Sequence, residues 1–232
     1  MKKILTVLAA ILAFTVFFAA CSKEPEPEPE SSSEPEPVSV VEEVVSSEPE
    51  EPVEEEPVKL KALVIYFSRP GGNYKVGDIT EGNTYKVAKE IALQTDAEMF
   101  EIKTLQEYPD DYDECVEVAQ KERDEMYRPA LVEYPDRDYI AGFDEIYLGY
   151  PIWIGDMPMA IYTFMENVDL DGKPLNVFIT HEGSRTAGTI EIIRRYYPYA
   201  TLSQPLTIYG SVAQNYPDDV KNDVANWLES IH

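Results

Sequence analysis

Short apolar runs alternate with amphipathic stretches from residue 62 onward. Residues 62–67, 146–150 and 175–180 are apolar runs with turn-forming residues around them. Unbroken runs of this length predict strands covered on both faces, as in a parallel sheet. Residues 98–102 are patchy and residues 206–209 alternate apolar with polar positions, so we expect these two strands at the edges of the sheet.

Helical periodicity fills the intervals between and after these strands. Asn83 and Thr84 are good N-cap types and precede the first helix. The other predicted helices cover residues 112–128, 159–168, 189–197 and 218–231. The resulting order, βαβαβαβαβα, implies right-handed crossovers with helices on both faces of the sheet. We therefore predict an α/β fold, a three-layer, doubly wound, five-stranded parallel sheet with strand order 2-1-3-4-5.

The first twenty residues have the layout of an export signal. Lys2 and Lys3 precede an apolar run over residues 4–18, which is shorter than the roughly 20 residues of a spanning helix. The run ends in Phe18-Ala19-Ala20-Cys21, which resembles a bacterial lipobox. We expect residues 1–20 to be a lipoprotein signal peptide and Cys21 to carry the lipid. The protein would then sit on the extracytoplasmic face of the cell membrane; a plain secretory signal with an incidental cysteine is the alternative.

Residues 21–58 are predicted to be the lipidated cysteine followed by a disordered tether. Residues 22–58 contain fourteen Glu, eight Pro and no aromatic residue. Such a stretch cannot bury enough apolar surface to offset its ordering entropy. The alternative is an acidic tail that binds cations or a partner. Residues 59–232 have the length of one compact domain.

Charge and cysteine content exclude several classes of function. The net charge is −25, to which residues 1–21 contribute +2, residues 22–58 contribute −13 and residues 59–232 contribute −14. This acidity makes nucleic acid a poor partner. Two cysteines and two histidines are too few for a disulfide scaffold or a framework of zinc ligands, and we predict no metal site. Cys115, on a predicted helix, is interpreted as a packing residue.

Candidate ligand-binding residues follow the predicted strands, because ligands of such sheets bind beyond the carboxyl ends of the strands. Ser68 follows the first strand, and thirteen residues separate it from Gly82-Asn83-Thr84 at a helix start. Hydroxyls, a glycine and the free N–H groups of a helix start form an anion site that needs no lysine. The acidity of the domain is therefore no objection to a phosphate ligand.

Two further loops are expected to converge on the same crevice. The loop after the third strand contains Trp153, which can stack on a flat ring. The loop after the fourth strand begins with His181 and contains a glycine, so it can expose backbone donors to that ring. Two plainer readings stay open: Trp153 can simply cover the core, and His181 can simply fix its loop.

Together these motifs resemble a flavodoxin-like FMN-binding family over residues 60–231. The resemblance implies that Ser68, Gly82, Asn83 and Thr84 hold the FMN phosphate. It implies further that the isoalloxazine ring is bordered on one side by Pro151, Ile152, Trp153 and Gly155, and on the other by His181, Glu182, Gly183 and Ser184. The chain departs from the family pattern at the insertion 69–81 and at Ile154, where relatives often carry Trp.

The resemblance implies an FMN-dependent redox protein that transfers electrons to a partner protein or a small-molecule acceptor. The carboxylates of Asp156 and Glu182 would lower the flavin potential if they lie close to the ring. An acidic surface favours a basic partner and a salt-dependent association rate. Two alternatives remain: an FMN-dependent quinone or NAD(P)H reductase, and a surface binding module that kept the fold without the flavin.

Overall fold

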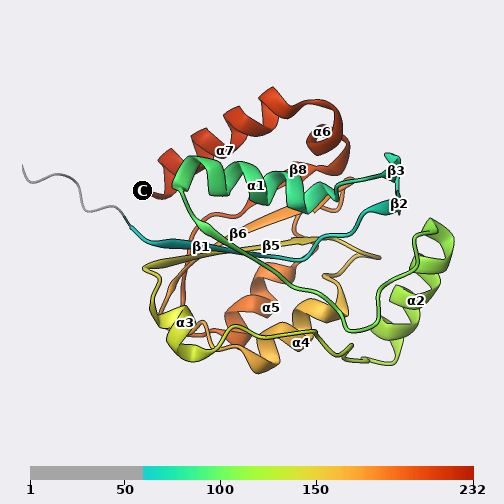
Figure 1. The fold of residues 1–232 in the computed structure, drawn as a ribbon, viewed down its shortest axis with the longest axis horizontal. Helices are drawn as coiled ribbons and strands as arrows, with labels where there is room; N and C mark the ends of the chain where they lie inside the picture. Colours follow the sequence, from blue (N-terminus) through green and yellow to red (C-terminus); the bar gives the residue numbers. More distant parts are fainter. Residues whose placement is uncertain (1–59) are drawn as a thin grey trace, which may run out of the picture. The chain divides into compact units, whose positions relative to one another are not determined.

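The computed structural model describes residues 60–232, so the predicted signal peptide, Cys21 and the tether lie outside the described residues. One sheet lies at the centre of this region (Figure 1). Its six strands are β1 (Ala62–Tyr66), β4 (Glu98–Glu101), β5 (Glu145–Pro151), β6 (Pro174–His181), β7 (Thr201–Leu202) and β8 (Leu206–Tyr209).

The strand order is β4-β1-β5-β6, followed by β7 and β8, which both pair with β6. Every pair in this sheet is parallel, which confirms the predicted 2-1-3-4-5 order and the two edge positions. The sheet differs from the five-stranded prediction because its last edge is split: Leu202 pairs with Leu175, and Leu206 pairs with Phe178. Pro205 lies in the break, where a residue without an N–H group cannot join a ladder.

Helices cover both faces of the sheet (Figure 1). One face carries α1 (Asn83–Thr95), α6 (Gly210–Asn215) and α7 (Pro217–Ile231), and the other carries α3 (Arg137–Ala141), α4 (Met159–Asn167) and α5 (Thr189–Tyr196). The remaining helix, α2 (Tyr112–Asp124), lies beside a hairpin made of β2 (Gly71–Asn73) and β3 (Gly77–Ile79).

Two hydrophobic cores explain the unbroken apolar runs. Because side chains alternate along a strand, Ala62, Val64 and Tyr66 of β1 pack under α1 and α7. The intervening residues, Leu63 and Ile65, pack under α4 and α5. Each residue of β1 is therefore buried, as a central parallel strand requires.

Several helix boundaries differ from the sequence predictions. Gly82 is the N-cap of α1, so Asn83 and Thr84 lie inside the first turn instead of capping it. The helix α2 ends at Asp124, four residues early, because Met126 adopts a left-handed φ of 51°. Three short elements, the hairpin, α3 and α6, were not predicted. Within residues 60–232, no helix combines the length and apolarity that crossing a membrane demands.

Candidate functional site

A cavity of about 240 Å³ lies at the carboxyl ends of the central strands, where the chain order reverses between β1 and β5. We call it the switch-point pocket. Eight of the residues predicted from sequence line it: Asn83, Pro151, Ile152, Trp153, Gly155, His181, Glu182 and Ser184. Four others do not line the pocket: Ser68 and Gly183 lie in loops at the strand ends, and Gly82 and Thr84 lie at the start of α1.

Two walls of the pocket were missed by sequence reasoning. The segment that leads into and through the hairpin contributes Arg69, Asn73 and Tyr74. The helix α2 contributes Cys115, Val116 and Ala119. Cys115 is buried, as its interpretation as a packing residue requires, and it also faces the pocket. No local pattern marks these residues, because only the placement of the hairpin and α2 brings them to the site.

The turn after β1 and the start of α1 fit closely together despite the insertion between them. A Cβ atom on Gly82 would lie 2.2 Å from the Ser68 hydroxyl and 2.7 Å from the Arg69 carbonyl oxygen, so any larger residue would displace this turn. The Ser68 hydroxyl accepts the N–H of Tyr85 at 3.0 Å. The amides of Asn83 and Thr84 precede Tyr85 in the first turn and have no carbonyl partner within the helix. This arrangement leaves backbone donors and the Ser68 hydroxyl proton for an anion.

The side chains of the Asn83-Thr84 pair are already engaged. The Thr84 and Thr180 hydroxyls lie 2.7 Å apart, and both residues are buried. The side-chain amide oxygen of Asn83, Oδ1, accepts from the side-chain amide of Gln214 of α6 at 2.8 Å. The two side chains therefore fix the helix start against β6 and α6, and the donors that remain at this turn are mainly backbone groups.

Trp153 is held by two other aromatic rings. Its ring packs edge-to-face against Phe67 at 5.3 Å and against Tyr108 at 5.1 Å between centroids. The Tyr108 hydroxyl donates to the Glu122 carboxylate of α2 at 2.6 Å. Trp153 is only half-buried and lines the pocket. Its orientation is thus set by the core while part of the indole faces the pocket.

A tight turn follows Trp153. Trp153 and Asp156 exchange two backbone hydrogen bonds, 2.7 and 3.0 Å long. Between them, Ile154 and Gly155 have φ values of 52° and 78°. A left-handed conformation is unusual for a β-branched residue and stores strain. Arg123 of α2 donates to the Ile154 carbonyl oxygen at 2.8 Å, which helps to hold this turn over the pocket.

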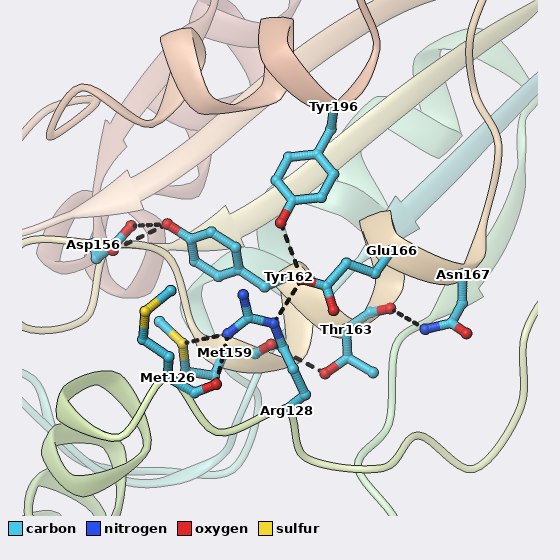
Figure 2. A network of polar contacts seen from close by, with 9 residues as sticks. All are labelled: Met126, Arg128, Asp156, Met159, Tyr162, Thr163, Glu166, Asn167 and Tyr196. Carbon is cyan, nitrogen blue, oxygen red and sulfur yellow. Dashed lines mark hydrogen bonds and ion pairs between the residues drawn. The ribbon is translucent and has the colours of Figure 1, made fainter. Parts of the chain in front are cut away.

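Asp156 does not line the pocket, and its carboxylate belongs to a polar network (Figure 2). Its carboxylate accepts from Tyr162 of α4 at 3.0 and 3.1 Å. Burial, followed by the Asp156 charge, raises the pKa of the Tyr162 hydroxyl, which therefore remains a donor. Arg128 lies over the Tyr162 ring and pairs with Glu166, which also accepts from Tyr196. This network anchors the loop after β5 to α4 and α5.

His181 is buried, and its ring is fixed by its own loop. Nδ1 accepts the N–H of Gly183 at 2.9 Å, and the ring packs against Tyr209 at 4.5 Å. Burial lowers the pKa of His181, Glu182 opposes that effect and Arg185 adds to it. The imidazole is therefore neutral at pH 7, with its proton assigned to Nε2 because Nδ1 accepts an amide proton.

Glu182 is the carboxylate that lines the pocket. It accepts the N–H of Ser211 at 2.6 Å, at the start of α6. Lys75 of the hairpin turn lies 3.9 Å from its other oxygen. Its negative charge is therefore opposed by the N-terminus of α6 and by a lysine.

Comparison with known proteins agrees with this geometry. The sequence profile of a flavodoxin family matches residues 61–231. A candidate flavoprotein from Bacteroides eggerthii is 22% identical, with a TM-score of 0.56 over 73% of this chain and 98% of that one. One from Bacteroides uniformis is 26% identical, with a TM-score of 0.54 over 72% and 98%.

A flavoprotein from Lactobacillus acidophilus, whose structure is a complex with FMN, is 17% identical, with a TM-score of 0.47 over 73% of this chain and 99% of that one. No curated protein matches the chain. The profile match covers nearly the whole described region and contains every element that lines the switch-point pocket. The chain therefore belongs to the flavodoxin family.

Proposed function

We propose that this chain is an FMN-binding redox protein that a lipid on Cys21 holds at the membrane. The cofactor is FMN, which flavodoxins bind at the switch point of the sheet. The observation that carries the proposal is the fit of Gly82 against Ser68 at that point, which exposes a helix start to an anion.

The phosphate end of the site uses neutral groups. The Ser68 hydroxyl and the amides of Asn83 and Thr84 are the donors that would bind the phosphate, assisted by the positive end of the α1 dipole. The Thr84 hydroxyl is bonded to Thr180 and supports the turn. These donors carry no formal charge, so the site needs no lysine or arginine side chain to bind the phosphate.

The ring end of the site lies between two loops. Residues 151–155, with Trp153, would cover one side of the isoalloxazine, and residues 181–184 would meet its other side. The neutral His181 keeps a proton on Nε2, and Phe67 and Tyr108 fix the orientation of the Trp153 ring. Bound there, FMN supplies the electron-transfer chemistry while the protein sets its orientation and potential.

The partner is either a redox protein or a small-molecule acceptor. Residues 59–232 carry a net charge of −14, which supports a basic partner whose association rate falls as salt rises. The rate of reaction with a small-molecule acceptor would show little salt dependence.

Stopped-flow reduction of the holoprotein by NADPH alone distinguishes a reductase from a carrier. A reductase is reduced by NADPH directly, whereas a carrier is reduced only when its partner protein is present.

The cofactor proposal is tested with the full chain purified in detergent. We expect flavin absorbance, or its appearance after FMN is added, with submicromolar affinity. If neither absorbance nor FMN binding is found, the flavin proposal is wrong and a flavin-free binding module is the better account.

Membrane anchoring is tested in cells. Wild-type protein should incorporate labelled fatty acid and fractionate with membranes, whereas Cys21→Ser should lose the label. Cys115→Ser is the matched control and should stay labelled. Equal labelling of the wild type and Cys21→Ser would contradict the lipid anchor.

A further inference from the structure

Arg69 is a buried cation at the wall of the switch-point pocket. Only 9% of the residue is exposed. Its guanidinium donates to four backbone carbonyl oxygens, those of Gly72, Pro109, Asp110 and Asp111. Within residues 60–232 it forms no ion pair with a carboxylate, which is unusual because buried arginines are nearly always paired with an acid.

The guanidinium also retains donor capacity. Nε and Nη2 are directed to Pro109, Asp110 and Asp111, and Nη1 donates to Gly72 at 2.6 Å. An arginine has five N–H groups, two of them on Nη1. The second Nη1 proton has no acceptor among the described residues, and Arg69 lines the pocket.

The charge of Arg69 reaches the inside of the pocket. It opposes the rise that burial causes in the pKa of Cys115, another residue of the pocket wall. The other charged group that lines the pocket is Glu182, which faces Lys75 and the Ser211 amide. Tyr74, Tyr112, Cys115 and His181 complete the titratable lining of the pocket.

We propose that Arg69 supplies the positive charge that stabilises the negative charge placed on the bound flavin by reduction. The inference rests on the proposed FMN site and concerns which charge sets the potential there. Asp156, which was expected to lower the potential, is turned into the network of Figure 2, whereas the buried and unpaired cation lines the pocket. Arg69 thus raises the midpoint potential by favouring the reduced, anionic flavin.

Two substitutions separate this electrostatic role from a structural one. Arg69→Gln removes the charge, and Arg69→Lys keeps it, while both lose most of the bonds to the four carbonyl oxygens. Both should lower the thermal unfolding midpoint by similar amounts. Only Arg69→Gln should weaken binding of reduced relative to oxidised FMN, by about tenfold, which equals about 30 mV for a two-electron couple. Spectroelectrochemistry of the holoproteins measures this shift.

A control and a wild-type measurement complete the test. Arg137→Gln removes one exposed charge from α3, away from the pocket, and should leave the potential unchanged. The midpoint potential of a flavin falls less steeply with pH once the reduced flavin is deprotonated. Because a nearby cation favours the deprotonated form, the slope for the wild-type protein should halve at a lower pH than the slope for free FMN in the same buffer. This measurement stands even if the Arg69 variants do not fold.

The outcomes are distinct. A full chain that binds no FMN overturns both the proposed function and this inference. If FMN binds normally but Arg69→Gln keeps the wild-type potential, or Arg69→Lys falls as far as Arg69→Gln, the inference alone is overturned. A wild-type pH slope identical to that of free FMN also overturns it.

Discussion

The hydroxyl oxygen of Ser68 accepts the backbone N–H of Tyr85 at 3.0 Å, although the two residues are 17 positions apart. The residues between them include the β2–β3 hairpin, after which the chain returns at Gly82 to the turn that follows β1. The insertion at residues 69–81 therefore leaves the motif intact in space. It adds the pocket wall that contains Arg69 and Tyr74.

Gly82→Ala should damage the anion-binding turn. The backbone of Gly82 has φ −63°, which any residue tolerates, so the effect is steric: the new Cβ would lie 2.2 Å from Ser68. We expect a loss of about 1–3 kcal/mol in unfolding free energy and at least tenfold weaker FMN binding, measured by urea denaturation and flavin titration. Gly142→Ala, with φ −70° and a nearest contact of 3.3 Å, is the control and should bind FMN normally.

Trp153→Phe should weaken FMN binding by roughly two- to tenfold, because an aromatic contact contributes about 0.5–1.5 kcal/mol. The chain has two tryptophans, so each single variant leaves one fluorophore. In the Trp227→Phe variant, bound FMN should strongly quench the fluorescence of the remaining Trp153. This variant should bind FMN with wild-type affinity. Quenching that is equally strong in both variants, with unchanged affinities, would place Trp153 away from the ring.

His181 should titrate below its usual pKa of about 6.5, because burial disfavours its charged form. Because the pKa of His181 is lower in the folded than in the unfolded protein, the unfolded chain binds more protons than the folded chain at pH values below about 6.5. The stability contribution is therefore complete above about pH 6.5 and is lost as the pH falls through the folded pKa. Protonation of Nδ1 also breaks the bond from Gly183 and should loosen the loop.

NMR titration of the two histidine rings checks this prediction. His232→Gln identifies the His181 signal, since the chain has only these two histidines. His181→Gln should make the acid side of the stability profile shallower than in the wild type. A His181 signal that titrates at or above the ordinary value would refute the buried, neutral imidazole.

Tyr162→Phe should loosen the loop that carries Trp153. The substitution removes the hydroxyl that donates to Asp156 while keeping the ring under Arg128 (Figure 2). We expect a loss of about 1–1.5 kcal/mol in unfolding free energy and modestly weaker FMN binding. Tyr199→Phe, at a side chain that is 80% exposed, should change stability by less than about 0.5 kcal/mol. Equal stabilities of the two variants would mean that the network does not support the loop.

The fold was largely predictable because its central strands are covered on both faces. Their apolar runs carry a strong signal, and the alternation with helices leaves few possible topologies. The hairpin, α3 and α6 were missed because each spans too few residues for a periodic pattern to emerge. The break at Pro205 was missed because β7 is only two residues long and is defined by its pairing with β6.

The sequence by itself determined the order of the sheet and the loops that must meet at its switch point, since parallel strands bring their carboxyl ends to one edge. Only the tertiary structure decided what surrounds that point. The local sequence around Arg69 is typical of a solvated turn. In the structure, however, Arg69 is buried at the pocket wall, where its guanidinium donates to carbonyl oxygens of residues 72 and 109–111. Its charge acquires a function there because contacts across some forty residues remove it from water, and no local pattern encodes such contacts.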